Sequence, residues 1–266
     1  MTTPVKIAIL GLGEEARSLA AGLQAAGGQV VGFDSVKPKN PGIPVAASAA
    51  EAVADADVVL SLNSASVAAR VAESVANHLK AGALYADLNS GTPGLKKQLA
   101  GMFPAESFVD FAFMNLTTEL GQSGTFAVSG GGARRFLDLL TPLGIEPEYV
   151  SEVPGEAAAR RILRSILDKG LAAVISDTLW AAKSLGMDGW AIEAIKQEFD
   201  TNNAETVQSL LNDTGKHPKR RSVEMSDISE LLSESNYDST MVNGIGLTYS
   251  HVMHGRKIPF ADLSDD

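Results

Sequence analysis

The chain has 266 residues, 45% of them hydrophobic and 20% charged, so it is long and apolar enough to bury a sizeable core. Its 32 acidic residues outnumber 22 basic ones, and the net charge of -10 argues against nucleic acid as a partner, because phosphate binding needs a basic face. Cysteine is absent, which excludes disulfide bonds and thiolate chemistry. No apolar run approaches the ~18–20 residues of a membrane helix, so we expect a cytoplasmic protein with no membrane partner.

The first 150 residues alternate between short aliphatic runs and Ala-rich amphipathic stretches. The aliphatic runs occupy residues 5–10, 29–34, 57–62, 83–89, 107–113 and 124–130. Between them lie the amphipathic stretches 14–26, 49–54, 66–80 and 93–101. Buried runs that alternate with helices are typical of a doubly wound parallel sheet. We therefore predict an α/β fold with an N-terminal Rossmann domain over residues 1–152.

The strand pattern ends near residue 150, and a long periodic segment over residues 155–185 follows. Pro154 suits the first turn of a helix and Gly186 suits its end. A helix of about 30 residues far exceeds the ~11–12 of an average one, so we expect other helices or a second subunit to clasp it. Further helical stretches occupy 188–200, 203–212, 217–235 and 238–254. We predict an all-helical C-terminal domain over residues 153–266 that forms the substrate pocket and a homodimer interface.

A glycine motif runs directly from the first predicted strand into the first predicted helix. It consists of Gly11, Leu12, Gly13, Glu14, Glu15 and Ala16. Gly11 permits the tight turn, Gly13 lets a pyrophosphate approach the backbone, and Ala16 is small enough for close helix–strand packing. We predict that this motif binds a dinucleotide. The two glutamates suit the helix dipole, but their side chains must point away from the phosphates.

An acidic residue, Asp34, ends the second predicted strand 21 positions after Gly13. A carboxylate there accepts hydrogen bonds from ribose hydroxyls and repels a 2′-phosphate, which favours NAD over NADP. In an alternative interpretation Asp34 only caps the turn at Ser35. Lys37 and Lys39 lie close by and would offset the repulsion, so NADP remains an open alternative.

The order of the motifs resembles the 6-phosphogluconate dehydrogenase and β-hydroxyacid dehydrogenase superfamily. More narrowly, it resembles NAD-binding 6-phosphogluconate-dehydrogenase-like proteins with a helical C-terminal domain of unknown function. The resemblance covers nearly the whole chain and rests on residues 11–16, 61–65, 85–97, 110–115, 124–132, 155–174 and 217–225.

The resemblance implies that two loops contact the cofactor. A loop of Leu62, Asn63 and Ser64 would border the adenine and the pyrophosphate, and a loop with Asn89 would lie against the nicotinamide and its ribose. Loops at the carboxyl ends of parallel strands form the ligand crevice, which agrees with this assignment. In the alternative interpretation, residues 89–93 are only a turn with a helix N-cap.

One departure from the superfamily pattern concerns the substrate loop. Typical β-hydroxyacid dehydrogenases carry a Ser-Gly-Gly run where this chain has Met114, Asn115 and Leu116. By position, Met114 and Asn115 would contact the substrate. We expect a different pocket, less suited to a small hydroxyacid.

A second departure concerns the catalytic lysine of the superfamily, whose position falls on Arg161, while an associated asparagine falls on Ser165. Arginine keeps its proton at any working pH, so Arg161 would clamp a carboxylate or stabilise an alkoxide rather than move a proton. Lys169, on the same helical face, would then inherit the catalytic role. In the alternative interpretation Arg160, Arg161 and Arg164 form a solvated or salt-bridged stripe.

One local basic cluster surrounds His217, with Arg220 and Arg221 beside it. The resemblance implies that these residues contact the anionic end of the substrate, and His217 would serve as a proton carrier with an ordinary pKa of ~6.5. The alternative is a solvated surface cluster. A second histidine pair, His251 and His254, has no carboxylates at ligand spacing, so we expect no metal site.

These observations lead to three hypotheses. The first is an NAD(P)-dependent oxidoreductase that transfers a hydride between a nicotinamide cofactor and a small polar, anionic hydroxy or keto compound. The second keeps the fold but changes the reaction to the reduction of an imine, because related imine reductases also lack the catalytic lysine and Met114 would suit a less polar substrate. The third is a dinucleotide-binding protein that has lost its chemistry, as Arg161 and the two glutamates suggest.

Overall fold

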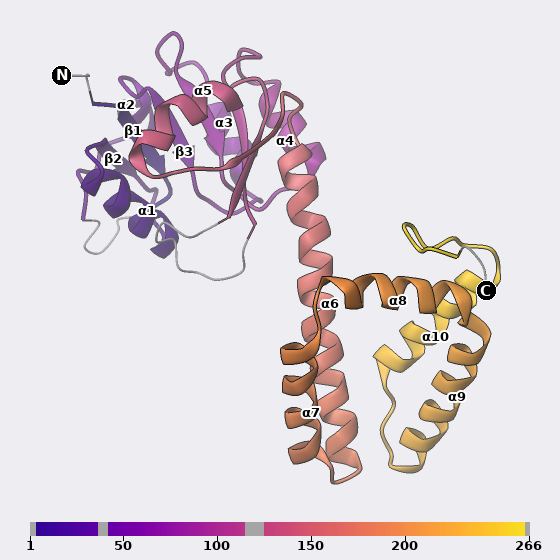
Figure 1. Ribbon diagram of the computed structural model, residues 1–266. Coiled ribbons are helices and arrows are strands. Elements are labelled where there is room, and N and C mark those ends of the chain that lie inside the picture. The colour runs from indigo at the N-terminus through magenta and orange to yellow at the C-terminus, as the bar shows by residue number, and fades with distance from the viewer. Residues whose placement is uncertain (1–3, 37–41, 115–124, 264–266) are drawn as a thin grey trace. The chain divides into compact units, whose positions relative to one another are not determined.

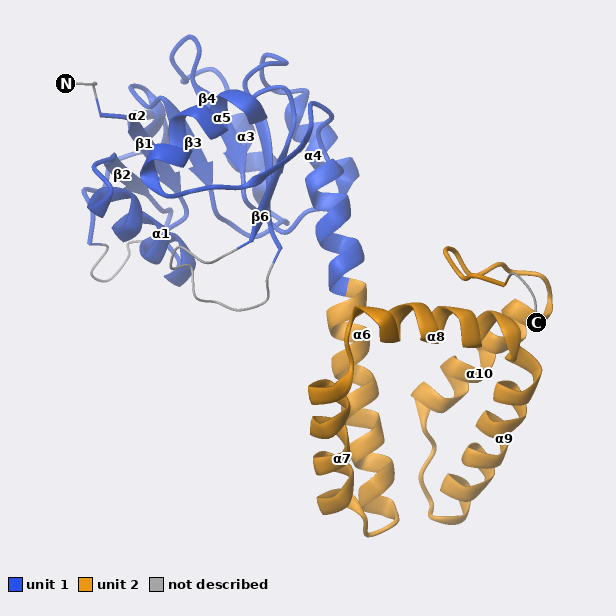
Figure 2. Cartoon of the chain, in the orientation of Figure 1, with its two compact units in different colours: residues 1–165 blue, residues 166–266 orange. Residues whose placement is uncertain are grey.

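The structure is a computed structural model, and it describes residues 4–36, 42–114 and 125–263. The chain forms two compact units, residues 1–165 and 166–266 (Figure 2). The division falls inside the long helix α6 (Glu156–Ser184). The first turns of this helix bind the sheet of the first unit, as described below. The domain boundary predicted at residues 152/153 remains a prediction.

A seven-stranded sheet forms the centre of the first unit, with strand order β2-β1-β3-β4-β5-β6-β7 (Figure 1). The strands are β1 (Lys6–Leu10), β2 (Gln29–Phe33), β3 (Val58–Ser61), β4 (Leu84–Asp87), β5 (Phe108–Phe113), β6 (Phe126–Ser129) and β7 (Glu148–Ser151). All neighbouring strands run parallel except β5 and β6, which are antiparallel. The predicted doubly wound α/β fold is therefore confirmed, with one antiparallel pair in an otherwise parallel sheet.

Helices cover both faces of this sheet. They are α1 (Glu14–Ala25), α2 (Ala49–Val53), α3 (Ala68–Val75), α4 (Pro93–Ala100) and α5 (Ala133–Leu140), which a short 3-10 turn (Thr141–Leu143) extends. Successive residues of a strand point to opposite faces. Ile7 and Ile9 accordingly join a core with α1 and α5, whereas Ala8 and Leu10 join a separate core with α2, α3 and α4. Each strand of the centre is thus buried on both sides, which explains the continuous aliphatic runs in the sequence.

The second unit contains only helices among its described residues. The remainder of α6 is followed by α7 (Asp188–Thr201), α8 (Ala204–Lys216), α9 (Pro218–Glu234) and α10 (Thr240–Met253). Local signals define their ends: Gly186 has a left-handed φ of +70° after α6, and Asn203 closes a capping box on α8. None of the described helices is long and apolar enough to cross a membrane.

Candidate functional site

The candidate site lies where the strand order of the first unit reverses. The chain places β2 on one side of β1 and β3 on the other, so the loops after β1 and β3 diverge at the carboxyl edge of the sheet. In open parallel sheets, ligands bind in the crevice at such a switch point. The loops after β1, β2, β3 and β4, together with the first turn of α1, carry every cofactor-binding residue that the sequence predicts.

The two glycines of the turn after β1 have different roles. Gly11 has a φ of +94°, and a Cβ atom there would lie 2.0 Å from the carbonyl oxygen of Leu62. Gly13 is the N-cap of α1 with an ordinary φ of -62°, and a Cβ atom there would meet nothing within 4 Å. Gly11 is therefore required by the fold itself, whereas Gly13 leaves open space at the amino end of α1, where an anion binds favourably. Ala16 is buried against the sheet, as predicted for the third position.

Asp34 connects this turn to the end of β2. Its Oδ2 atom accepts a hydrogen bond of 2.7 Å from the backbone N–H of Leu12, and its Oδ1 atom accepts one of 2.9 Å from the N–H of Val36. The carboxylate thus caps its own turn, as the alternative interpretation holds, and also fixes the glycine turn. Carboxylate oxygens accept more than one hydrogen bond, so both remain able to accept from ribose hydroxyls.

A cavity of about 340 Å³ adjoins Asp34 on one side of the glycine turn. Its lining includes Phe33, Asp34, Ser35, Asn63, Val67 and Arg70. Arg70 lies on α3 and is exposed. Nothing in the helix pattern tells which of its exposed side chains faces the end of β2, so the sequence does not single out Arg70. Arg70 brings a positive charge to the cavity that Asp34 also lines.

A second cavity, of about 370 Å³, lies on the other side of the same turn. Its lining residues are Gly13, Glu14, Glu15, Ala16, Leu62, Asn63, Leu88, Asn89, Ser90 and Phe113. Asn63 lines both cavities. The structure therefore brings together most of the predicted cofactor residues around one turn. Ser64 lines neither cavity and instead pairs its hydroxyl with that of Ser66 at 2.8 Å.

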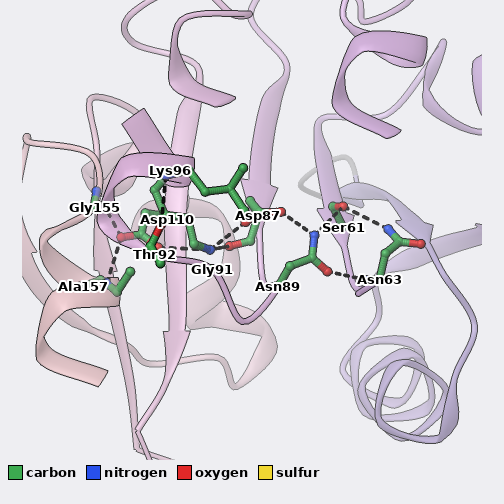
Figure 3. Close-up of polar contacts among 12 residues, drawn as sticks. Ser61, Asn63, Asp87, Asn89, Gly91, Thr92, Lys96, Asp110, Gly155 and Ala157 are labelled. Carbon is green, nitrogen blue, oxygen red and sulfur yellow. Dashed lines mark hydrogen bonds and ion pairs between the residues drawn. The ribbon is translucent and has the colours of Figure 1, made fainter. Parts of the chain in front are cut away.

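Asparagines connect the loops after β3 and β4 (Figure 3). The side-chain amide of Asn63 donates to the carbonyl of Leu10 at 3.0 Å and to the Ser61 hydroxyl at 3.1 Å. The amide of Asn89 donates to Ser61 at 3.3 Å and to the Asp87 carboxylate, and its oxygen accepts from the backbone N–H of Asn63. Asn89 is almost fully buried and its polar atoms are all in use. Its side chain holds the two loops together, and Asn89 also lines the second cavity.

A fully buried ion cluster lies beneath the loop after β4 (Figure 3). The ammonium of Lys96, on α4, lies 2.6 Å from Asp87 Oδ2 and 3.2 Å from Asp110 Oδ1, and it also donates to the Asp87 carbonyl at 2.7 Å. All three side chains are at most 1% exposed. Burial raises the pKa of the Asp87 carboxyl above its ordinary value, against the opposing effect of Lys96. The sequence does not single out this cluster. Two aspartates within apolar strands need a cation nearby, which is the one signal that could have indicated it.

The second oxygen of Asp110 binds the start of α6. It accepts hydrogen bonds from the Ser129 hydroxyl at 3.1 Å, from the N–H of Gly155 at 3.2 Å and from the N–H of Ala158 at 2.9 Å. The Ser129 oxygen in turn accepts from the N–H of Ala157 at 3.0 Å. A carboxylate at a helix N-terminus satisfies its free amides and complements its dipole. The cluster therefore fixes α6 to the sheet beside the loop after β4.

Arg161 and Ser165 lie on the part of α6 that belongs to the first unit. The Arg161 guanidinium donates to the carbonyl of Gly91 at 3.2 Å, next to the loop that lines the second cavity. Arg160 forms an ion pair with Glu148, so the predicted salt-bridged stripe holds for this residue. Lys169 lies in the second unit and is exposed. Catalytic roles for Arg161, Ser165 and Lys169 remain predictions.

The predicted substrate residues fall into different parts of the chain. Met114 follows β5, donates its N–H to the carbonyl of Thr125 at 2.8 Å and packs on a small alanine cluster. It does not line the second cavity. Asn115 lies outside the described residues, as do Leu116, Lys37 and Lys39.

The basic cluster belongs to the second unit. His217 is exposed at the junction of α8 and α9. Arg221 contacts Asp213 at 3.1 Å and donates a hydrogen bond of 3.2 Å to the Tyr249 hydroxyl. The hydrogen bond to Tyr249 raises the pKa of Arg221. Arg220 lies 3.5 Å from Glu224. These contacts give Arg220 and Arg221 structural partners in the helical unit, in agreement with the surface interpretation. A role in substrate binding stays a prediction.

Known proteins resemble this chain at two levels. Residues 6–91 match the family model described as NADP oxidoreductase, coenzyme F420-dependent. Among solved structures, a conserved hypothetical protein from Sinorhizobium meliloti 1021 is 28% identical with a TM-score of 0.61, over 99% of this chain and 93% of that chain. The conserved protein MTH1747, described as of unknown function with structural similarity to 3-hydroxyacid dehydrogenases, is 26% identical with a TM-score of 0.61, over 94% and 97%.

An imine reductase from Myxococcus stipitatus in complex with NADP+ has a TM-score of 0.80 at 17% identity, over 95% of this chain and 96% of that chain. A V8 variant of an imine reductase from the same organism is known in complex with NAD+. The chain thus resembles an NADP oxidoreductase family over residues 6–91 and a protein with structural similarity to 3-hydroxyacid dehydrogenases over nearly its whole length, and it shares its fold with imine reductases. These likenesses confirm the predicted resemblance.

Proposed function

We propose that this protein binds a nicotinamide dinucleotide across the glycine turn and transfers a hydride between it and a small polar substrate. The observation that carries the proposal is the open face of Gly13, where an added Cβ would meet nothing within 4 Å, in a turn that adjoins both cavities: Gly11 lines the first and Gly13 the second. A pyrophosphate fits such a place, because the free amides at the start of α1 point to it. The adenosine half then belongs in the Asp34 cavity and the nicotinamide half in the Asn89 cavity.

The residues of this chain bind and orient the cofactor and the substrate, and the cofactor supplies the hydride when it is bound. Asp34 accepts from the adenosine ribose, and the amides after Gly13 hold the pyrophosphate. Asn63 and Asn89 keep the loops after β3 and β4 at a fixed separation. The buried Lys96 cluster holds the second of these loops and the start of α6 in place. Arg161 adds a contact between α6 and that loop.

NAD is the cofactor that we propose, with NADP as the alternative. Asp34 supports NAD through its charge, while Arg70 at the same cavity supports NADP. A thermal-shift titration with NAD+, NADH, NADP+ and NADPH separates the two. A ligand at 100 times its Kd adds ~2.7 kcal/mol of stability. We expect NAD(H) to raise the melting temperature and Asp34→Asn to reduce this rise. A larger rise with NADP(H), which Arg70→Gln abolishes, would mean that NADP is the preferred cofactor.

For the substrate we propose a small hydroxy or keto compound, with an imine as the second candidate. The replacement of the superfamily's Ser-Gly-Gly run by a sequence that begins with the apolar Met114 favours the less polar imine. A screen of hydroxyacids and cyclic imines, followed by nicotinamide absorbance, distinguishes them. Turnover of hydroxyacids supports the first candidate, and turnover of imines alone supports the second. Binding without any turnover would support an inactive dinucleotide-binding protein.

We further propose that the helical unit forms a homodimer. Several large apolar side chains on α6, α7 and α8 are more than 40% exposed, among them Leu171, Trp180, Trp190, Phe199 and Val207. Exposed apolar surface of this extent is typical of an interaction site. Analytical ultracentrifugation tests this: sedimentation as a monomer at micromolar concentration would contradict it.

A further inference from the structure

The cavity assigned to the nicotinamide half has acidic residues in its wall and no basic ones. Of its ten lining residues, only Glu14 and Glu15 are ionisable. Both lie in the first turn of α1 and are exposed. Among the described residues, neither glutamate has an ion-pair or hydrogen-bond partner that would neutralise it. The ionisable groups in the wall of this cavity are therefore two carboxylates.

Two positive charges close to this cavity, those of Lys96 and Arg161, are committed elsewhere. The Lys96 ammonium is buried between two carboxylates, Asp87 and Asp110, so that cluster carries no net positive charge when both are ionised. The Arg161 guanidinium donates to the carbonyl of Gly91 and does not line the cavity. The amino end of α1 contributes a partial positive charge of roughly half a unit, less than the charge of the two glutamates.

The nicotinamide ring changes its charge in the reaction. It is a cation in the oxidised cofactor and neutral in the reduced cofactor. A negative charge near the ring therefore stabilises the bound oxidised cofactor and has little effect on the reduced one. We infer that Glu14 and Glu15 make this protein bind the oxidised nicotinamide more tightly than the reduced one. The inference rests on the proposed function, since it assigns the nicotinamide to the Asn89 cavity.

The expected size of the difference in affinity follows from the exposure of the two glutamates. Charges about 4 Å apart at a protein surface interact strongly, but solvent screening reduces exposed pairs to ~1 kcal/mol or less. Two glutamates beside a ring that excludes part of the water should change the ratio of the two dissociation constants by about fivefold. The pyrophosphate carries the same charge in both cofactor forms, so its repulsion by the glutamates cancels from this ratio.

Tighter binding of the oxidised form has a consequence for direction. The potential of the bound couple falls by ~30 mV per tenfold difference in affinity for a two-electron couple, so a fivefold difference is about 20 mV. The bound reduced cofactor then gives its hydride to a carbonyl or imine carbon more readily, with a proton taken from solvent completing the product. The acidic wall thus favours reduction of the substrate.

Titration calorimetry with NAD+ and NADH on the full chain tests the inference without turnover. We compare the wild type with the double variant Glu14→Gln and Glu15→Gln, and with Glu106→Gln as a matched control. Glu106 is exposed just before β5, at the opposite edge of the sheet from the cavities. The ratio of the NADH to the NAD+ dissociation constant should fall about fivefold in the double variant and stay unchanged in the control. High salt should reduce the same ratio in the wild type, because it screens exposed charges.

An unchanged ratio in a double variant that still binds both nucleotides would overturn the inference and leave the proposed function intact. Failure of the wild type to bind any nicotinamide nucleotide would overturn the proposed function itself. If the double variant unfolds, the two single variants provide the same comparison, each with about half the effect on a logarithmic scale.

Discussion

In residues 1–165 most large apolar side chains are buried, whereas in residues 166–266 many lie on the surface. The first unit contains two cores that enclose the sheet from both faces. In the described part of the second unit, the buried hydrophobic residues are only Ala182, Ala191 and Leu232. The polar side chains differ in the same way. Those of the first unit form a buried network at the candidate site, and most of those in the second are exposed.

The difference shows what each architecture needs. A sheet strand that is covered on both faces completes its core within one chain. A set of helices leaves apolar stripes that must be covered by something else. We therefore expect the first unit to hold the proposed cofactor site by itself, and the second unit to cover its exposed apolar side chains in the proposed homodimer. Each prediction below tests one side of this contrast.

The largest effect is expected from Lys96→Met in the first unit. The change leaves two buried carboxylates without their cation, which should cost about 3–5 kcal/mol of unfolding free energy. Urea denaturation monitored by circular dichroism measures the loss. Lys97→Met is the matched control. Lys97 is exposed on the same helix, so this substitution should change the unfolding free energy by less than ~0.5 kcal/mol. Equal effects of the two substitutions would show that the ion cluster does not stabilise the fold.

Gly11→Ala should be the next most damaging change. Its φ is +94°, and an added Cβ atom would lie 2.0 Å from the carbonyl oxygen of Leu62, so there is no room for a methyl group. Backbone strain of this kind costs about 1–3 kcal/mol, and the displaced loop should also weaken dinucleotide binding. Thermal denaturation would reveal the loss. A melting temperature equal to that of the wild type would mean that the turn can adopt another conformation.

Phe199→Asp tests the second unit. Phe199 is 55% exposed on α7, and a charge at the centre of an apolar interface costs about 2 kcal/mol, or roughly a 30-fold weaker dimer. Sedimentation equilibrium should show the variant dissociating at concentrations where the wild type is dimeric. The far-ultraviolet circular dichroism should stay unchanged. A variant as dimeric as the wild type would place the interface elsewhere.

A smaller effect concerns pH and Asp87. Because its pKa is raised in the folded state, the folded chain binds more protons at this site than the unfolded chain. Its contribution to stability is therefore fully present below the ordinary value of ~3.9 and falls as pH rises through the raised pKa. Asp87→Asn removes this dependence. The stability of the wild type relative to the variant should be higher in acid, near the ordinary pKa of ~3.9, than at neutral pH. A difference that does not change with pH would contradict the shift.

Much of the fold follows from local patterns in the sequence. The aliphatic runs mark β1 to β6, and Pro154 with Gly186 brackets α6. The elements that the pattern does not predict are α5 and β7. The first is only eight residues long and begins with two arginines after its first alanine, and the second is a four-residue edge strand without a full aliphatic run.

The candidate site could be predicted only in part. The glycine turn and Asp34 are contiguous or at fixed spacing, so the sequence indicates them. Lys96 and Arg70 look like ordinary surface residues of amphipathic helices, and only the fold reveals what they face. Asn89 lies where it was predicted, but its side chain holds a neighbouring loop. Such roles depend on contacts between distant segments, which no local pattern encodes.

Calorimetric titration of NAD+ into the wild type and Gly13→Ala tests the central claim most directly. The added methyl group points into open space and Gly13 has an ordinary φ, so the variant should fold with unchanged stability. If a pyrophosphate occupies that space, the affinity should fall by on the order of tenfold, or about 1.4 kcal/mol. Equal affinity in the two proteins, or no binding to either, would contradict the claim that the glycine turn holds the dinucleotide.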